Sequence, residues 1–267
     1  MNAMSILTYH SIDVSGSVVS CAPRDFADQM TYLSDEGFRG VSLREAVTHR
    51  QRHGSWPTKS VALTFDDGFA NFYEQARPIL LSHNFTATVF VISGHMNGLN
   101  DWAEPPAELG AQRMLSWRQT AELAASGIEI GSHTRTHPDL RRCGPEKARL
   151  EMNESRKEIE DHLGRKVESF AYPYGSTSAA LCKLAANEFS AACTTRLRRA
   201  NSDPLESLPR IDMYYIRSQR KLQRLLSGDL DQYLTVRSVG RAIRGALTSD
   251  FRAGRERPDY DPADLSE

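Results

Sequence analysis

Short apolar segments alternate with longer stretches of mixed polarity along most of the chain. The apolar segments are three to seven residues long and comprise residues 5–9, 60–65, 86–92, 128–130, 167–172 and 190–194. Runs of this length that are rich in β-branched and aromatic residues are typical of buried strands. In the stretches between them, apolar positions recur every three or four residues, which indicates helices with one buried face. Alternating strands and helices predict a parallel sheet or barrel.

Two of the expected helices carry sequence signals for their ends. Ser116 and Gln119 have the spacing of an N-terminal capping box. Pro145 suits the first turn of a helix, and Gly164 suits the position just after its end. Residues 94–112, by contrast, include two prolines and three glycines. That segment is predicted to be a long loop, of the kind that often shapes a substrate cleft.

The pattern changes near the C-terminus. Residues 1–220 are predicted to form the sheet or barrel, 221–251 one or two amphipathic helices, and 252–267 a polar tail. In the amphipathic region, apolar positions such as Leu222 and Val236 alternate with arginines. We expect its apolar side to pack on the barrel, although a basic amphipathic helix is also able to lie on a membrane surface.

Composition narrows the possible partners. With 267 residues, the chain has the size of a single α/β barrel. Its 33 basic and 34 acidic residues give a formal net charge of −1, so charge gives no reason to expect nucleic acid, and a neutral or small substrate suits the chain better. No protein partner is predicted. The four cysteines form no CxxC pair, so we expect reduced thiols rather than a thiolate metal site or a disulfide framework.

The N-terminal sequence predicts a cytoplasmic protein. Residues 1–10 lack the basic flank and the long apolar segment of a secretory signal. No stretch of the sequence is apolar for long enough to be a membrane span. The expectation of a cytoplasmic location applies only to a sequence that has not been trimmed.

Two adjacent carboxylates follow one of the predicted strands. Asp66 and Asp67 come directly after the apolar run 60–65 and are followed by Gly68. Residues at the carboxyl ends of barrel strands line active sites, and a glycine permits a tight turn that aims both carboxylates into one cavity. An Asp-Asp-Gly turn that only caps the next helix would have the same sequence.

Two histidines follow another predicted strand at metal-ligand spacing. His133 and His137 are four residues apart, and Pro138 ends any helical turn between them. A single histidine here would more often be an ordinary loop residue, but two that can meet at one ion favour a metal site. With Asp67 as a third ligand, the set corresponds to a hydrolytic zinc site, and Asp66 remains available as a base.

At these motifs the chain resembles the polysaccharide deacetylases of the NodB-homology type, carbohydrate esterase family four. The family signature is TFDDG followed by H-[ST]-x-x-H, and both motifs are present without a substitution, at residues 64–68 and 133–137. With a third motif at residues 170–175, the resemblance covers about residues 5–215. It implies a distorted (β/α)7 TIM-like barrel in a single domain, a divalent metal, and removal of N- or O-acetyl groups from sugars.

The resemblance also implies roles for individual residues. Asp66 resembles the general base, and Asp67, His133 and His137 resemble the metal ligands.

Three further residues match the family motif that lines the substrate groove. They are Tyr172, Pro173 and Tyr174. The backbone N–H of Tyr174 would help to bind the oxyanion, and such a donor typically contributes about 2.7 to 4 kcal/mol in the transition state. The same residues would also form an ordinary turn after a strand.

The chain departs from the family pattern at two places. Many members have an arginine that steadies the catalytic aspartate where this chain has Ala171. Arg210 is the candidate substitute, because a guanidinium can hold a carboxylate through two hydrogen bonds, and a surface arginine near a strand end is the alternative. Many members also have a Leu-x-His motif near the C-terminus, and none follows His162 here.

His10 is the candidate general acid in place of that missing histidine. It follows Tyr9 at the end of the first predicted strand and resembles the early Tyr-His of the circularly permuted group of the family. A histidine with a pKa near neutrality suits proton donation to a leaving amine, although His10 could instead have a structural role. The remaining histidines are predicted to be non-catalytic: His49, His53, His83, His95 and His162.

These expectations combine into a metal-dependent hydrolase that releases acetate from an N-acetylated sugar, oligosaccharide or glycan precursor. Zinc is the metal that an Asp-His-His set favours, and cobalt, nickel and manganese also accept such ligands. Two alternatives are open. One is a hydrolase of another amide or a cyclic imide on the same fold, and the other is a glycan-binding protein that retains the site without activity.

Overall fold

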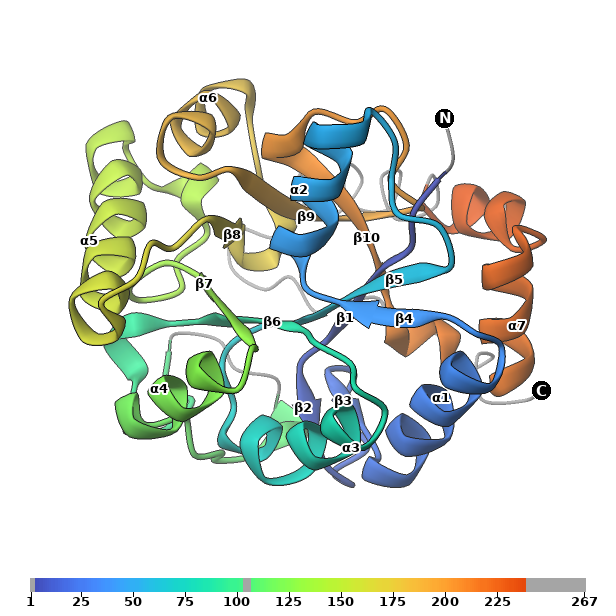
Figure 1. The fold of residues 1–267 in the computed structure, drawn as a ribbon. Coiled ribbons are helices and arrows are strands. Elements are labelled where there is room, and N and C mark those ends of the chain that lie inside the picture. Colours follow the sequence, from blue (N-terminus) through green and yellow to red (C-terminus); the bar gives the residue numbers. More distant parts are fainter. Residues whose placement is uncertain (1–2, 103–106, 239–267) are drawn as a thin grey trace.

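Seven parallel strands close into a barrel in the part of the chain that the computed structural model describes, residues 3–102 and 107–238 (Figure 1). In order around the barrel they are β1 (Ile6–Tyr9), β10 (Leu208–Asp212), β9 (Ala191–Leu197), β8 (Ser169–Ala171), β7 (Glu129–Ser132), β6 (Thr88–Val91) and β5 (Ser60–Phe65). Strand β1 pairs with both β10 and β5, which closes the ring. The predicted distorted (β/α)7 barrel in a single domain is confirmed.

A further strand distorts the barrel next to β5. This strand, β4 (Arg39–Val41), pairs with residues 60–62 of β5, whereas Thr64 and Phe65 pair with β6. Strands β4 and β6 therefore share one edge of β5. A small two-stranded sheet of β2 (Ser11–Ile12) and β3 (Ser20–Cys21) follows β1.

Helices cover the outside of the barrel (Figure 1). They are α1 (Pro23–Asp35), α2 (Leu43–His53), α3 (Arg77–Ser82), α4 (Trp117–Ala125), α5 (Pro145–Leu163), α6 (Ala179–Glu188) and α7 (Gln219–Ser227). Helix α4 begins with the predicted capping box of Ser116 and Gln119. Helix α5 begins at Pro145 and is followed by Gly164, whose φ of 61° is the left-handed conformation that glycine favours. Both predicted sets of helix signals are confirmed.

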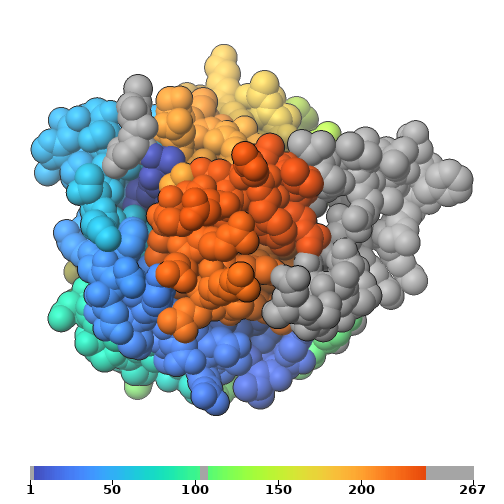
Figure 2. All heavy atoms as spheres, turned by 90° about the vertical axis from the view of Figure 1, so that its right-hand side faces the viewer, coloured from blue at the N-terminus to red at the C-terminus, as the bar shows by residue number. Residues whose placement is uncertain are grey.

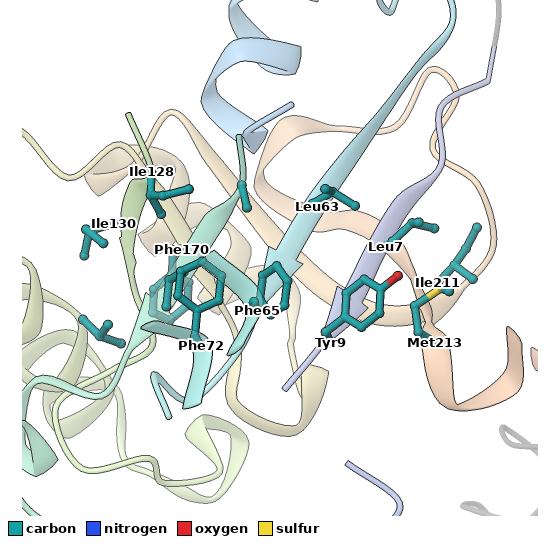
Figure 3. Packing of buried hydrophobic residues seen from close by; sticks show 14 of the residues in the cluster. Leu7, Tyr9, Leu63, Phe65, Phe72, Ile128, Ile130, Phe170, Ile211 and Met213 are labelled. Atoms are coloured by element: carbon teal, nitrogen blue, oxygen red, sulfur yellow. The ribbon is translucent and has the colours of Figure 1, made fainter. Parts of the chain in front are cut away.

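Aromatic side chains pack together at the ends of β1 and β5, among them Tyr9, Phe65 and Phe72 (Figure 3). The ring of Phe65, the last residue of β5, stacks on Tyr9 of β1 at a centroid distance of 5.2 Å. The Phe65 ring also makes edge-to-face contacts with Phe26 and Phe72, at centroid distances of 5.7 Å and 4.6 Å. Buried aromatic pairs of this kind stabilise beyond the area that they bury. The two strands are therefore held firmly at the point where the candidate site begins.

The interior of the barrel contains several small side chains. Alternate residues of a strand point to opposite faces, and Ala62, Ala171 and Cys193, which face inward, are all fully buried. Phe90 belongs to the same cluster of buried residues inside the barrel. The space left by the small residues accommodates Arg210, whose guanidinium carbon lies 5.7 Å from the centre of the Phe90 ring.

Helix α7 lies beside α1, and the last described residues follow it. Leu222 of α7 is buried, and α7 contacts α1; in Figure 2 this region is coloured orange to red. Residues 231–238 are helical, and Leu234 is buried, but the Val236 side chain is 71% exposed. The rest of the two predicted C-terminal segments lies outside the described residues. Among the described helices, none has both the length and the apolar character needed to cross a bilayer.

Candidate active site

The side chains predicted for the site come from the carboxyl ends of the barrel strands. Asp66 and Asp67 follow β5, His133 follows β7, and His10 follows β1. Arg210 lies within β10. In a parallel barrel these ends meet at one face, where active sites are built. The barrel thus brings together residues from the two ends of the sequence.

Three groups that can bind a metal converge at this face. The Oδ1 atom of Asp67 lies 3.4 Å from Nε2 of His133 and 3.5 Å from Nε2 of His137. All three ligand atoms lie within 4.8 Å of one another, and all three residues are buried. Two donors bound to zinc at about 2.0–2.1 Å with a tetrahedral angle would be about 3.3 Å apart. The donor types and their spacing therefore fit a divalent metal ion.

A sharp backbone turn aims Asp67 at the histidines. The φ angles are 71° at Asp67 and 82° at Gly68, both in the left-handed region. The carbonyl of Gly68 accepts a hydrogen bond from the N–H of Leu115 at 2.8 Å. A Cβ at residue 68 would lie 3.0 Å from the side chain of Val91, so the turn needs glycine for space as well as for its φ.

The two imidazoles present their Nε2 atoms to Asp67. The Nδ1 atom of His133 lies 2.7 Å from the carbonyl oxygen of Ala171, which fixes the ring and leaves Nε2 for a metal. Burial lowers the pKa of His137 to about 3, so this ring is neutral, as a metal ligand must be. Burial would also lower the pKa of His133, but its hydrogen bond to Asp67 and the nearby negative charges raise it instead.

Asp66 forms a buried ion pair with Arg210. The guanidinium donates two hydrogen bonds to the carboxylate, at 2.7 Å to Oδ1 and 2.6 Å to Oδ2. It also donates to the carbonyl of Thr194 at 3.1 Å. Arg210 is only 1% exposed, so the alternative of a surface arginine does not hold. Burial alone would raise the pKa of Asp66, but the charges of Arg210 and His133 hold it well below its usual value, and Asp66 is an anion at neutral pH.

His10 lies beside the Asp66–Arg210 pair. Its Nε2 atom is 3.9 Å from Oδ2 of Asp66, and its side chain is 18% exposed. That position gives the imidazole access both to the carboxylate and to solvent, which a proton donor needs.

The three residues of the Tyr-Pro-Tyr motif are placed differently from one another. Tyr172 is completely buried, and its hydroxyl donates to the carbonyl of Glu206 at 2.9 Å, so its side chain does not reach the site. Tyr174 has a φ of 58°, is 49% exposed, and places its ring 4.8 Å from that of His137. Pro173 is buried between them. Of the two tyrosines predicted to line the substrate groove, only Tyr174 has its side chain beside the candidate metal ligands.

Trp102 also borders the site, although the sequence analysis did not name it as a site residue. Its ring lies 5.1 Å from that of His137 and 6.0 Å from that of Phe69, and its side chain is only 5% exposed. The ring of His95 also contacts the indole, edge-on, at a centroid distance of 5.7 Å. An aromatic residue within the predicted loop 94–112 was the only available signal. The indole covers one side of His137 with apolar surface.

Known proteins with similar sequences are polysaccharide deacetylases by name. The sequence profile described as polysaccharide deacetylase matches residues 53–188. The chain is 30% identical over 172 residues to YxkH of Bacillus subtilis (strain 168), whose name places it among the polysaccharide deacetylases, and the match covers 64% of this chain and 57% of that protein. It is 26% identical over 165 residues to the poly-beta-1,6-N-acetyl-D-glucosamine N-deacetylase of Staphylococcus aureus (strain MRSA252), covering 58% of this chain and 54% of that protein. The chain thus spans little more than half the length of these relatives.

Two solved structures are similar to most of the chain. One is the Streptococcus pyogenes deacetylase PplD in complex with acetate, with a TM-score of 0.70, 29% identity, and coverage of 79% of this chain and 92% of that one. The other is IcaB from Ammonifex degensii, with a TM-score of 0.69, 25% identity, and coverage of 85% and 97%. The assignment to a circularly permuted group remains a prediction.

Proposed function

The chain belongs to the polysaccharide deacetylase family, and we propose that it hydrolyses N-acetyl groups of a glycan or glycan precursor that contains amino sugars and releases acetate. The observation that carries this proposal is the convergence of Asp67, His133 and His137 beside the Asp66–Arg210 pair. The relative from Staphylococcus aureus is named for the same reaction on poly-beta-1,6-N-acetyl-D-glucosamine, which supports an N-acetylated substrate.

Asp67, His133 and His137 are proposed to hold the metal, and zinc suits their two nitrogen donors and one oxygen donor best. A divalent cation bound there would acidify a water molecule and polarise the acetyl carbonyl. His133 is oriented for this role by its contact with the carbonyl of Ala171, which leaves Nε2 as the ligand atom.

Asp66 is proposed to accept the proton of the attacking water. It is ionised at neutral pH, because the charge of Arg210 outweighs the effect of burial on its pKa. The two hydrogen bonds from Arg210 also fix the orientation of the carboxylate. A base that is held in place in this way does not have to be ordered when the substrate binds.

Two further groups are proposed to act on the acyl and amine ends of the substrate. The Tyr174 backbone N–H would donate to the developing oxyanion, supported by the left-handed turn at this residue beside His137. His10 would donate a proton to the departing amine, since it lies 3.9 Å from Asp66 and is open to solvent.

The experiment that tests the proposed function is acetate release from N-acetylglucosamine oligomers, measured with zinc-loaded, chelated and reloaded protein. We expect release from the loaded protein, its loss after chelation, and its return with zinc. Bound metal without acetate release would contradict the proposal. Cleavage of another amide or of a cyclic imide would then favour the rival hydrolase, and glycan binding alone would favour a silent binder.

Replacing His10 by alanine is expected to lower kcat about 100-fold and to leave zinc affinity unchanged, because His10 is not in the metal-binding group. The loss should be much smaller with 4-nitrophenyl acetate, whose phenolate leaves without protonation. His83→Ala, at a histidine predicted to be non-catalytic, is the control and should retain full activity. Equal losses on the amide and the aryl ester would argue that His10 has only a structural role.

A further inference from the structure

The loop that carries the two histidines has an unfavourable backbone conformation. Thr134 has a φ of 66° and His137 a φ of 58°, both in the left-handed region. Residues with a side chain rarely adopt this region, and a β-branched residue such as threonine does so least readily. A conformation of this kind persists only where the surrounding structure holds it in place.

Glu151 on α5 holds the middle of this loop. Its Oε2 atom accepts hydrogen bonds from the backbone N–H groups of Arg135 at 3.0 Å and Thr136 at 2.8 Å. Its Oε1 atom accepts from the hydroxyl of Thr136 at 2.6 Å. In the described part of the chain, every hydrogen bond that the Glu151 carboxylate accepts comes from this loop, and the residue is only 7% exposed.

Neighbouring residues of α5 extend the same contact. Glu151, Ser155 and Glu158 share one face of the helix, because they are four and three residues apart. Ser155 forms a hydrogen bond of 2.9 Å with Ser132, the residue before His133. Glu158 accepts a hydrogen bond of 2.8 Å from the side chain of Arg135. This polar face of α5 therefore contacts both the last residue of β7 and the loop that carries the two histidines.

Ser93 and Gly94 hold the backbone of the loop through two further hydrogen bonds. The N–H of Gly94 donates to the carbonyl of Arg135 at 2.9 Å, and a Cβ at residue 94 would lie only 2.5 Å from that oxygen. The N–H of Ser93 donates to the carbonyl of Thr134 at 3.3 Å. Glu151 is a buried charged side chain that binds two consecutive N–H groups between the histidines.

We propose that Glu151 is a positioning residue for the metal site. Its carboxylate fixes the backbone of residues 134–136, so that the Nε2 atoms of His133 and His137 are both directed at Asp67 before any metal binds. The inference rests on the metal site of the proposed function and is independent of the substrate. Loss of an outer partner of a metal ligand typically weakens metal binding about 10- to 100-fold.

The test compares Glu151→Met with Glu151→Gln. Methionine has a similar length but cannot accept the two N–H groups, whereas the glutamine carbonyl can accept both. We expect zinc affinity, measured by competition with a chelator, to fall about 10- to 100-fold in Glu151→Met and to stay within about threefold of the original in Glu151→Gln. The visible absorption spectrum of the cobalt-loaded protein should change in the first variant only.

Glu154→Met is the matched control on the same helix. The Glu154 carboxylate is 3.7 Å from the side chain of Arg135, and its side chain is 51% exposed, so its loss should alter neither zinc affinity nor the cobalt spectrum. Thr136→Val, which removes only the hydroxyl donor, provides a milder variant if Glu151→Met does not fold, and it should weaken zinc binding measurably. Unchanged zinc affinity in Glu151→Met, or in Thr136→Val if that variant has to be used, would overturn the inference. A loss in Glu151→Gln as large as in Glu151→Met would also overturn it.

Because these measurements use the metal alone, they separate this inference from the proposed function. A protein that binds zinc through a loop held by Glu151 but deacetylates no glycan would support the first and contradict the second.

Discussion

Asp66→Asn is expected to reduce acetate release by about 10³- to 10⁴-fold while the protein still binds zinc. General base catalysis typically contributes about 10²- to 10⁴-fold, and an amide cannot accept the proton of the attacking water. The upper part of that range applies because the carboxylate is fixed by Arg210 and ionised at neutral pH. Zinc should remain bound because Asp67, His133 and His137 are unchanged.

The measurement pairs turnover with zinc content and thermal unfolding of the same samples. Asp203→Asn is the matched control, since Asp203 also accepts two hydrogen bonds from an arginine, Arg198, but outside the metal-binding group. It should leave turnover unchanged. If Asp66→Asn kept substantial activity, Asp66 would not be the base. If it lost zinc, Asp66 would have to be assigned to the metal-binding group instead.

The core of the candidate site could be predicted from the sequence because each of its motifs is local. Asp66 and Asp67 are adjacent, and His133 and His137 are four residues apart, so one short segment after a strand carries each pair. The strands before them are apolar runs that stand out from their surroundings. Strand β5 was predicted with its observed bounds, and β6 and β7 were predicted to within two residues.

Strand β10 could not be predicted in this way because its stability depends on distant partners. It contains Pro209 and Arg210, which are both unusual inside a buried strand. The arginine is compatible with the barrel interior only because it pairs with Asp66, which is 144 residues away in the sequence. The pairing could be proposed from the chemistry of the two groups, but the strand that enables it could not be read from a local pattern.

The position of Tyr172 shows how strand geometry limits a motif. Phe170 of β8 and Tyr172, which directly follows the strand, pack in the cluster between the barrel and its helices, whereas Ala171 packs in the cluster inside the barrel. The alternation of side chains along a strand therefore places the Tyr172 ring away from the site. Trp102 and Glu151 could not be assigned to the site from the sequence. Each contacts the loop that carries the two histidines through tertiary contacts that no sequence period encodes.

Arg210→Met is expected to destabilise the protein by about 3–5 kcal/mol, the typical effect of removing one partner from a buried ion pair. Asp66 would remain almost completely buried and would lose both guanidinium hydrogen bonds. Methionine fills a similar volume but cannot compensate a negative charge. Urea or thermal unfolding of the metal-free protein measures the loss without a contribution from zinc binding.

Arg198→Met is the control for the loss of an arginine that binds an aspartate through two hydrogen bonds. Its partner is Asp203, but the Arg198 side chain is 42% exposed and Asp203 keeps a hydrogen bond from the N–H of Asn201, so the expected loss is smaller than that of Arg210→Met. The double variant with Asp66→Asn and Arg210→Met removes both charges of the pair, so it no longer buries the Asp66 charge without its partner, and it should be more stable than Arg210→Met alone. A double variant as unstable as the single one would mean that Arg210 stabilises the barrel mainly through its packing on Phe90 and its bond to Thr194, and not through the charge of Asp66.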